Sequence, residues 1–159
     1  MSEEIRTPMR RVLEAEDVDV HFIGRDYSPI LGRQCRWTMW EQDVGHYCQK
    51  IDFDIALAPI ADNLFNRSKT AIRALEMGAL GIPVVASNRL PYSDYVMDGK
   101  TGFLVNNEAE WIDALTTLIG DANLREQMGE AAREQARAWT IEEGWRLWEA
   151  TYEYAAGGD

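Results

Sequence analysis

The segment FNRSKTAIRALEMGALGIPVVAS, residues 65–87, holds a lysine and a glutamate at positions unusual for a surface helix. Lys69 lies at the predicted start of an amphipathic helix, where a cation interacts unfavourably with the helix dipole. A lysine at this position therefore suggests a role other than helix stability. A helix start at the edge of a parallel sheet offers unpaired N–H groups. With Ser68 as the predicted N-cap, Lys69 and Thr70 would therefore hold an anion such as a diphosphate. An ordinary cap with a solvent-facing lysine fits the same residues.

Glu76 is the second charge. At 100° per residue, Glu76 lies about 40° from Ile72 and about 60° from Ala79, at the border of the predicted apolar stripe. A carboxylate there could accept hydrogen bonds from both hydroxyls of a ribose. The alternative is a glutamate that is hydrogen-bonded within the helix packing, for example to Arg73, because glutamate is rarely buried unpaired.

Other candidate motifs do not meet their requirements. DGKTG, residues 98–102, looks like the end of a phosphate loop, but Asp94 stands where the first glycine is required. The two histidines and two cysteines lack paired metal-ligand spacing, and no nucleophilic triad stands out. We expect neither a metal site nor a cofactor.

Strands and helices alternate along the chain. The predicted strands are residues 18–24, 35–40, 53–59, 82–87 and 103–105, and helices are predicted over 3–16 (interrupted early by Pro8), 41–50 and from Ser68, Asn107, Asp121 and Thr140. This order predicts one α/β domain over residues 1–159: a three-layer, Rossmann-like, doubly wound parallel sheet of about five strands, with C-terminal helices packed on it. Ile72, Leu75 and Ala79 are the predicted core face of the helix that starts at Ser68. We expect Trp139, Trp145, Trp148 and Tyr152 to cover the core, with room for a partner surface.

Charge and composition narrow the possible partners. The net charge is -11 and the pI about 4.6, so the overall field repels nucleic acid, anionic membranes and nucleotides. We expect no nucleic-acid partner, and a phosphate ligand must be captured locally. There is no secretory leader and no apolar run near membrane-spanning length, which predicts no transmembrane segment and a cytoplasmic location. Cys35 and Cys48 are then thiols, and a disulfide between them is the lesser alternative.

Three stretches together resemble the donor-binding half of the retaining GT-B glycosyltransferases, the glycosyl transferases group 1 family with two Rossmann-like domains. They are FDIALAPIADNLFNRSKTAIRALEMGALGIPVVAS, NRLPYSDYVMDGKTGFLV and EWIDALTTLIGDANLREQMGEAAREQA. The resemblance implies a nucleotide-diphosphate sugar donor, with the diphosphate at the helix N-terminus and the ribose on the second of two glutamates. Glu76 stands at that second glutamate, and Ser68 replaces the first, so the usual contact to the sugar is absent or altered.

The resemblance also implies a set of site residues. Pro59, Asp62 and Lys69 match a subgroup in which a lysine becomes the phosphate ligand, which makes Lys69 the predicted catalytic residue. Asp94 is the acidic residue of the loop after the fifth family strand. Arg25 and Asn66 complete the predicted nucleotide-sugar-binding set.

Two parts of the family pattern have no counterpart in this chain. The acceptor-binding domain is missing, and so is the first strand of the donor domain, which is central in the family order 3-2-1-4-5-6. Either the second and fourth family strands pair directly, or another chain fills the gap.

The sequence leaves three functions open. The first is the donor-binding half of a retaining glycosyltransferase, whose acceptor domain is supplied by another polypeptide or is missing because the sequence is a fragment; the partner is then an acceptor-domain chain, or the chain forms a homo-oligomer. The second is a non-catalytic nucleotide or nucleotide-sugar binding module. The third, a receiver-type signalling domain, needs an acidic residue at the carboxyl end of a strand, whereas Asp54 stands at the start of one.

Overall fold

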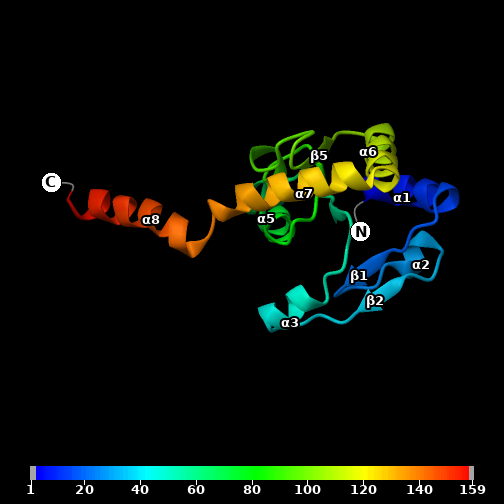
Figure 1. Ribbon diagram of the computed structural model, residues 1–159, viewed down its shortest axis with the longest axis horizontal. Helices are drawn as coiled ribbons and strands as arrows, with labels where there is room; N and C mark the ends of the chain where they lie inside the picture. The colour runs from blue at the N-terminus through cyan, green and yellow to red at the C-terminus, as the bar shows by residue number, and fades with distance from the viewer. Residues whose placement is uncertain (1–2, 158–159) are drawn as a thin grey trace.

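The computed structural model describes residues 3–157, and helices alternate with strands through most of them (Figure 1). In chain order the elements are α1 (Glu3–Ala15), β1 (His21–Ile23), α2 (Ser28–Leu31), β2 (Arg36–Thr38), α3 (Val44–Gln49), β3 (Ala56–Ala58), α4 (Leu64–Arg67), α5 (Ile72–Ala79), β4 (Val84–Ser87), η1 (Tyr92–Asp94), β5 (Gly102–Val105), α6 (Glu108–Gly120), α7 (Ala122–Arg137) and α8 (Ile141–Ala156). The predicted α/β class is confirmed.

The five strands form two parallel sheets rather than one. One has the order β1-β2 and the other the order β3-β4-β5. Five parallel strands agree with the predicted number, although most strands are shorter than the apolar runs that predicted them. Within residues 3–157, β1 and β3 do not pair. Direct pairing across the missing family strand, one of the two expected outcomes, is therefore not observed.

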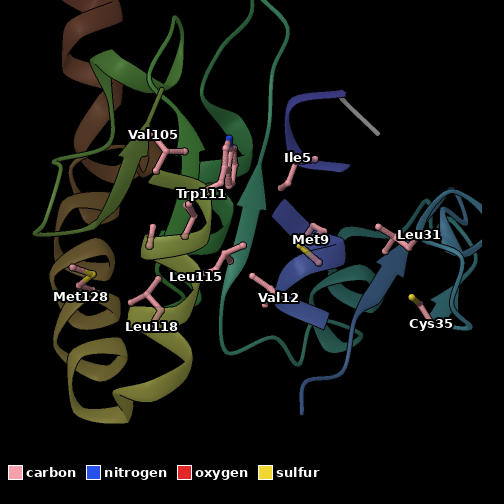
Figure 2. Packing of buried hydrophobic residues seen from close by; sticks show 12 residues of the cluster. Ile5, Met9, Val12, Leu31, Cys35, Val105, Trp111, Leu115, Leu118 and Met128 are labelled. Atoms are coloured by element: carbon pink, nitrogen blue, oxygen red, sulfur yellow. The ribbon is translucent and has the colours of Figure 1, made fainter. Parts of the chain in front are cut away.

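The three-stranded sheet is covered on both faces, as the three-layer prediction requires. Alternate residues of β4 face different clusters: Val85 faces the cluster with Trp111, Leu118 and Met128, and Val84 and Ala86 face the other. Because successive side chains of a strand point to opposite faces, each cluster occupies one side of the sheet. Figure 2 shows the first cluster, in which buried side chains of α1 lie between those of α6 and those at Leu31 and Cys35.

Helices α5 and α7 approach each other closely through small residues. A Cβ added at Gly78 would lie 3.0 Å from the Ala132 carbonyl oxygen, and one at Gly129 would lie 2.1 Å from the Gly81 carbonyl oxygen. Gly81 itself has φ +75° and ends α5: its N–H donates to Gly78, while the Ile82 N–H donates to Met77. This is a Schellman motif, so the predicted glycine at the end of the helix is confirmed.

This close approach also changes the buried face of α5. Ala74, Met77 and Gly78 are its buried residues, whereas Ile72 is 51% exposed. The predicted stripe of Ile72, Leu75 and Ala79 is therefore wrong, and only Leu75 is partly buried. The reason is α7, which contacts the small-residue face and is distant in the sequence.

The two ends of the chain hold further corrections. Pro8 does not interrupt α1. The helix continues from Glu3 to Ala15, and the Pro8 ring is fully buried within it. At the other end, α6 and α7 pack on the sheet but α8 extends away from it (Figure 1). Trp145, Trp148 and Tyr152 of α8 are exposed and do not cover the core, whereas Trp139, although 63% exposed, packs edge-on against the buried Tyr95 ring. Thr140 is the N-cap of α8 as predicted, without a side-chain capping hydrogen bond.

Candidate functional site

The predicted site residues follow three parallel strands. Arg25 follows β1, residues 62–70 follow β3, and Asp94 follows β4. The carboxyl ends of parallel strands in one sheet lie at the same edge, which is where open α/β sheets bind ligands. The segments after β3 and β4 therefore share an edge, while Arg25 belongs to the separate two-stranded sheet.

Ser68 does not begin the helix that carries Glu76. Asn63 is instead the N-cap of an earlier short helix, α4, and its side chain accepts a hydrogen bond from the Asn66 N–H at 2.9 Å. Ser68 ends α4, and its hydroxyl donates to the Leu64 carbonyl oxygen at 3.1 Å. The predicted N-cap is therefore wrong, because Asn63 caps the short helix α4 upstream, Ser68 ends that helix, and α5 begins only after Ala71.

The N-terminus of α5 is free of side-chain caps. Ala71 is its N-cap residue and makes no side-chain hydrogen bond. The first N–H groups of a helix have no partner within the helix and carry its positive dipole end, so they can receive an anion. Lys69 and Thr70 lie in the exposed connection immediately before this N-terminus, and the Lys69 Nζ lies 4.6 Å from the centroid of the Phe65 ring.

Asp62 and Asn66 hold the α4 segment in place. The Arg67 Nε donates to Asp62 at 2.7 Å, and this hydrogen bond lowers the pKa of the Asp62 carboxyl. The Asn66 side chain donates to the Ala61 carbonyl oxygen at 2.8 Å. Both residues fix the loop between β3 and α5, and so position Lys69.

Glu76 is half-buried on the second turn of α5. Burial raises the pKa of its carboxyl, and the nearby charge of Arg73 opposes that effect. No hydrogen bond or ion pair joins the Glu76 carboxylate to another residue in the part of the chain that the structure describes. The alternative in which Arg73 hydrogen-bonds Glu76 is therefore wrong. The carboxylate has its hydrogen-bonding capacity available for a ligand.

Tyr47 of α3 is a neighbour of Glu76 that sequence reasoning missed. Burial raises the pKa of the Tyr47 hydroxyl, and the charge of Glu76 raises it further. The two side chains lie 29 positions apart in the sequence on different helices, so no local pattern connects them. The phenol of Tyr47 is therefore close enough to the Glu76 carboxylate for the two groups to interact electrostatically.

Arg25 and Asp94 lie apart from this group. Arg25 is exposed after Gly24 and its guanidinium lies 5.5 Å from the centroid of the Tyr27 ring. Asp94 is exposed in η1. The described hydrogen bonds and ion pairs bring neither side chain to Lys69 or Glu76, so the structure does not assemble the whole predicted set.

A second polar group at the same edge was not predicted. The buried Ser87 hydroxyl, at the end of β4, accepts the Ile60 N–H at 2.9 Å and donates to Glu4. Arg89 donates to Glu4 at 2.6 Å and to the Ile60 carbonyl oxygen at 3.1 Å. These bonds hold the start of α1 at the carboxyl edge of the three-stranded sheet. The one sequence signal was a serine that ends an apolar strand.

A surface hollow of about 440 Å³ lies at the opposite edge. It is lined by residues that precede β3 and β4, including Phe53, Leu80 and Ile82, and by Arg125 of α7. None of the predicted site residues lines it. Across residues 3–157, no three His, Cys, Asp or Glu side chains are grouped as a metal site would require. No helix among the described residues has the length and apolar character to cross a membrane.

Comparison with known proteins connects these features to one family. A family model described as "Glycosyl transferases group 1" matches residues 31–135. The D-inositol 3-phosphate glycosyltransferase of Paenarthrobacter aurescens is 41% identical over 75 residues, which are 46% of this chain and 17% of that protein. The matched part of this chain therefore spans less than a fifth of that relative.

Two solved structures show the same fold. Sucrose-phosphate synthase from Thermosynechococcus elongatus has a TM-score of 0.70 and 16% identity, and the match covers 98% of this chain and 42% of the other. A variant of TarM from S. aureus, in complex with fondaparinux, α-GlcNAc-glycerol and UDP, has a TM-score of 0.69 and 18% identity over 94% of this chain and 33% of the other.

Proposed function

We propose that this chain, which belongs to the glycosyl transferases group 1 family, binds the donor nucleotide-diphosphate sugar of a glycosyl transfer reaction. The family model covers about two thirds of the chain. The proposed site lies at the carboxyl edge of β3 and β4, between the loop that carries Lys69 and the second turn of α5.

The observation that carries the proposal is the state of Glu76. A half-buried carboxylate with no hydrogen-bond partner among the described residues is costly for the folded chain unless a ligand completes it. A ribose presents two adjacent hydroxyl donors, and one ionised carboxylate can accept both. We therefore assign Glu76 to the ribose.

The diphosphate would lie at the N-terminus of α5. The uncapped N–H groups after Ala71 supply hydrogen bonds and the positive end of the dipole, and Lys69 supplies a charge. Lys69 reaches this position by leaving the Phe65 ring, which is itself exposed. A cation is needed here because the net charge of -11 otherwise repels a nucleotide.

In the reaction, the bond between the anomeric carbon and the diphosphate oxygen breaks, and the diphosphate leaves with the electron pair. Lys69 and the α5 N-terminus stabilise the negative charge that develops on that oxygen. The oxygen of the acceptor hydroxyl forms the new bond to the anomeric carbon, with retention, and its proton passes to the departing diphosphate oxygen. The reaction also needs an acceptor-binding domain, which lies outside residues 1–159, and the free thiols Cys35 and Cys48 favour a cytoplasmic setting.

A binding module without transfer activity is the second candidate. It is favoured by Ser68, which stands in place of a family glutamate and whose hydroxyl is bonded to the Leu64 carbonyl oxygen. In both candidates the nucleotide binds in the same place, so nucleotide binding is tested first and sugar transfer second.

The test is calorimetric titration of the chain with UDP, GDP and ADP. We expect one nucleotide to bind, Glu76→Ala and Lys69→Ala each to weaken it about tenfold or more, and Glu126→Ala and Lys100→Ala, at exposed positions far along the chain, to leave it unchanged. No heat with any nucleotide would overturn both candidates. Transfer measured with and without an acceptor domain then separates the enzyme from the module.

A further inference from the structure

Arg89 lies at the carboxyl edge of the three-stranded sheet, two residues after the end of β4. Its backbone forms a tight turn, in which the Arg89 N–H donates to the Ser87 carbonyl oxygen at 2.7 Å and the Arg89 carbonyl oxygen accepts the Tyr92 N–H at 2.9 Å. The Arg89 Nη1 donates to the carbonyl oxygen of Ile60, which follows β3, at 3.1 Å. The guanidinium therefore connects the ends of the two strands that precede the proposed donor site.

The charge of Arg89 also reaches the loop that carries Lys69. The pKa of the Asp62 carboxyl is lowered first by its hydrogen bond with Arg67, and further by the charges of Arg67 and Arg89. Arg67 is already paired with Asp62 at 2.7 Å, so its charge is offset. Arg89 is therefore a further cation beside the same loop.

The protein uses one side of the Arg89 guanidinium. Nη1 donates to Glu4 at 2.6 Å and to the Ile60 carbonyl oxygen, whereas Nε and Nη2 have no hydrogen-bond partner among the described residues. The Arg89 side chain is 34% exposed, so a ligand can reach these two nitrogens. The N–H groups of Nε and Nη2 form a planar fork that matches two oxygens of a phosphate.

Glu4 and Ser87 keep this guanidinium in place. One oxygen of the Glu4 carboxylate accepts the Ser87 hydroxyl, and the other accepts Arg89. Ser87 is 1% exposed, and its oxygen also accepts the Ile60 N–H at 2.9 Å. Because these bonds already fix the Arg89 side chain, it would lose little conformational freedom when it binds a ligand.

We propose that Arg89 is a second diphosphate-binding residue of the donor site, with Nε and Nη2 as its donors and Glu4 as the residue that positions it. Lys69 supplies one positive charge, whereas a diphosphate carries more than one negative charge, and the chain as a whole is at -11. As the sugar departs, Arg89 stabilises the charge that develops on the diphosphate. This inference rests on the proposed function.

The test separates the two parts of the ligand. Inorganic pyrophosphate is the probe for the diphosphate position, and its binding is followed by phosphorus NMR. Uridine, guanosine and adenosine are the probes for the nucleoside position, and their binding is followed by saturation-transfer NMR. We expect Arg89→Gln to weaken pyrophosphate binding about tenfold or more and to leave nucleoside binding unchanged. Glu76→Ala should show the opposite pattern, because it removes the ribose contact.

Arg133 offers a matched control. Its guanidinium also donates to one glutamate, Glu130 at 2.7 Å, and to one backbone oxygen, that of Leu80 at 3.1 Å, but Leu80 precedes β4 at the opposite edge of the sheet. Arg133→Gln changes the net charge by the same amount as Arg89→Gln and should leave the binding of both probes unchanged.

A second variant at the same position guards against a loss of folding. Arg89→Lys keeps the charge and loses the fork, so it should weaken pyrophosphate binding by less than Arg89→Gln does. Urea unfolding shows that each variant is folded under the conditions of the titration. If Arg89→Gln does not fold, a loss of pyrophosphate binding in Arg89→Lys with normal nucleoside binding supports the proposal, and unchanged pyrophosphate binding contradicts it.

Several results would overturn the assignment of Arg89. Unchanged pyrophosphate binding in Arg89→Gln, together with weaker nucleoside binding in Glu76→Ala, would remove Arg89 from the site and leave the proposed function standing. Equal losses of pyrophosphate and nucleoside binding in Arg89→Gln would mean that Arg89 only supports the fold, and an equal effect of Arg133→Gln would assign the loss to net charge. The absence of pyrophosphate binding to the parent chain would also contradict the proposal.

The proposed function can fail separately. Pyrophosphate binding that depends on Arg89, with no binding of any nucleoside or nucleotide, would support the anion site at Arg89 and overturn the assignment of Glu76 to a ribose.

Discussion

The three-stranded half of the molecule and the two-stranded half are both parallel sheets, but their strands differ in composition and are buried to different extents. In the first half, Val85 and Ala86 of β4 are 0% exposed, because α5, α6 and η1 cover the sheet. In the second, all three residues of β1 are only partly buried and Trp37 of β2 is 44% exposed. The difference shows that an apolar strand becomes a core strand only where neighbours exist on both sides and on both faces.

The largest expected effect compares two tryptophans. Trp111 of α6 is 1% exposed at the centre of the first cluster, so Trp111→Ala should destabilise the fold by about 3–5 kcal/mol. Trp37 is 44% exposed and makes one hydrogen bond, to the Gly24 carbonyl oxygen, so Trp37→Ala should cost about 1 kcal/mol. Urea unfolding of the two variants measures the contrast. Equal losses would mean that the halves are equally packed.

A glycine pair tests the α5–α7 contact that closes the first half. A Cβ at Gly129 would lie 2.1 Å from a backbone oxygen, so Gly129→Ala should cost about 1–3 kcal/mol, since neither helix can move without repacking. Gly144, in α8, has nothing within 4 Å of the position that a Cβ would take, and Gly144→Ala should stabilise its helix by about 0.5–1 kcal/mol. Thermal unfolding of both variants measures these two changes in stability. A Gly129→Ala variant as stable as the parent would contradict the close approach.

Local signals were enough for much of the better-packed half. Helices follow Asn107 and Asp121 as predicted, the side chains of these two residues accept hydrogen bonds from the N–H groups of Glu110 and Leu124, and Gly81 ends α5. Such signals act within a few residues, so a sequence reveals them directly. Even here the predicted start of α5 was wrong, because the sequence also contains an N-cap residue at Asn63, which begins α4.

What the sequence could not reveal depends on distant partners. Ser87 bonds Glu4 across 83 positions, and the buried face of α5 is chosen by a helix more than 40 positions later. The aromatic residues of α8 fit a core-covering pattern but find no core. In the candidate site, family resemblance directed attention to Glu76 and Lys69. The absence of a partner for Glu76, and the presence of Tyr47 beside it, came only from the structure.

Glu76 extends the comparison because it is half-buried on α5 and its charge reaches Tyr47 of α3. Burial raises the pKa of its carboxyl in the folded chain, so ionisation opposes folding. At pH values below the unfolded pKa, near 4.5, the protonated Glu76 carboxyl favours the folded state. This contribution to the free energy of unfolding is lost as the pH rises through the higher pKa of the folded chain. We therefore expect Glu76→Gln to be modestly more stable than the parent at pH 7, with the difference shrinking toward pH 4.5.

Urea unfolding of the two proteins across this pH range measures that difference. Glu126→Gln, at an exposed position of α7, is the matched control and should show no such trend. A Glu76→Gln advantage that grows as pH falls would contradict the raised pKa. Nucleotide affinity provides a second reading, because the ribose contact needs the ionised carboxylate and should weaken over the same acid range.

The smallest expected effect concerns Asp52, the residue that connects the halves. Its hydrogen bond with Arg36, and then that with His21, lowers the pKa of the Asp52 carboxyl below 3.8. Asp52 therefore contributes stability at pH values above its unfolded pKa, and this contribution is lost as the pH falls through its lower pKa in the folded chain. Because the pair is exposed and screened by salt, we expect a slight change in global stability and a clearer one in local opening. Hydrogen exchange at His21 and Ile23, compared between the parent, Asp52→Asn and the exposed-site control Asp113→Asn, measures it. If Asp52 holds the amino end of β1 against the first half, the substitution speeds exchange there and leaves Val85 unchanged; equal acceleration at β1 and β4 would show that the halves open together.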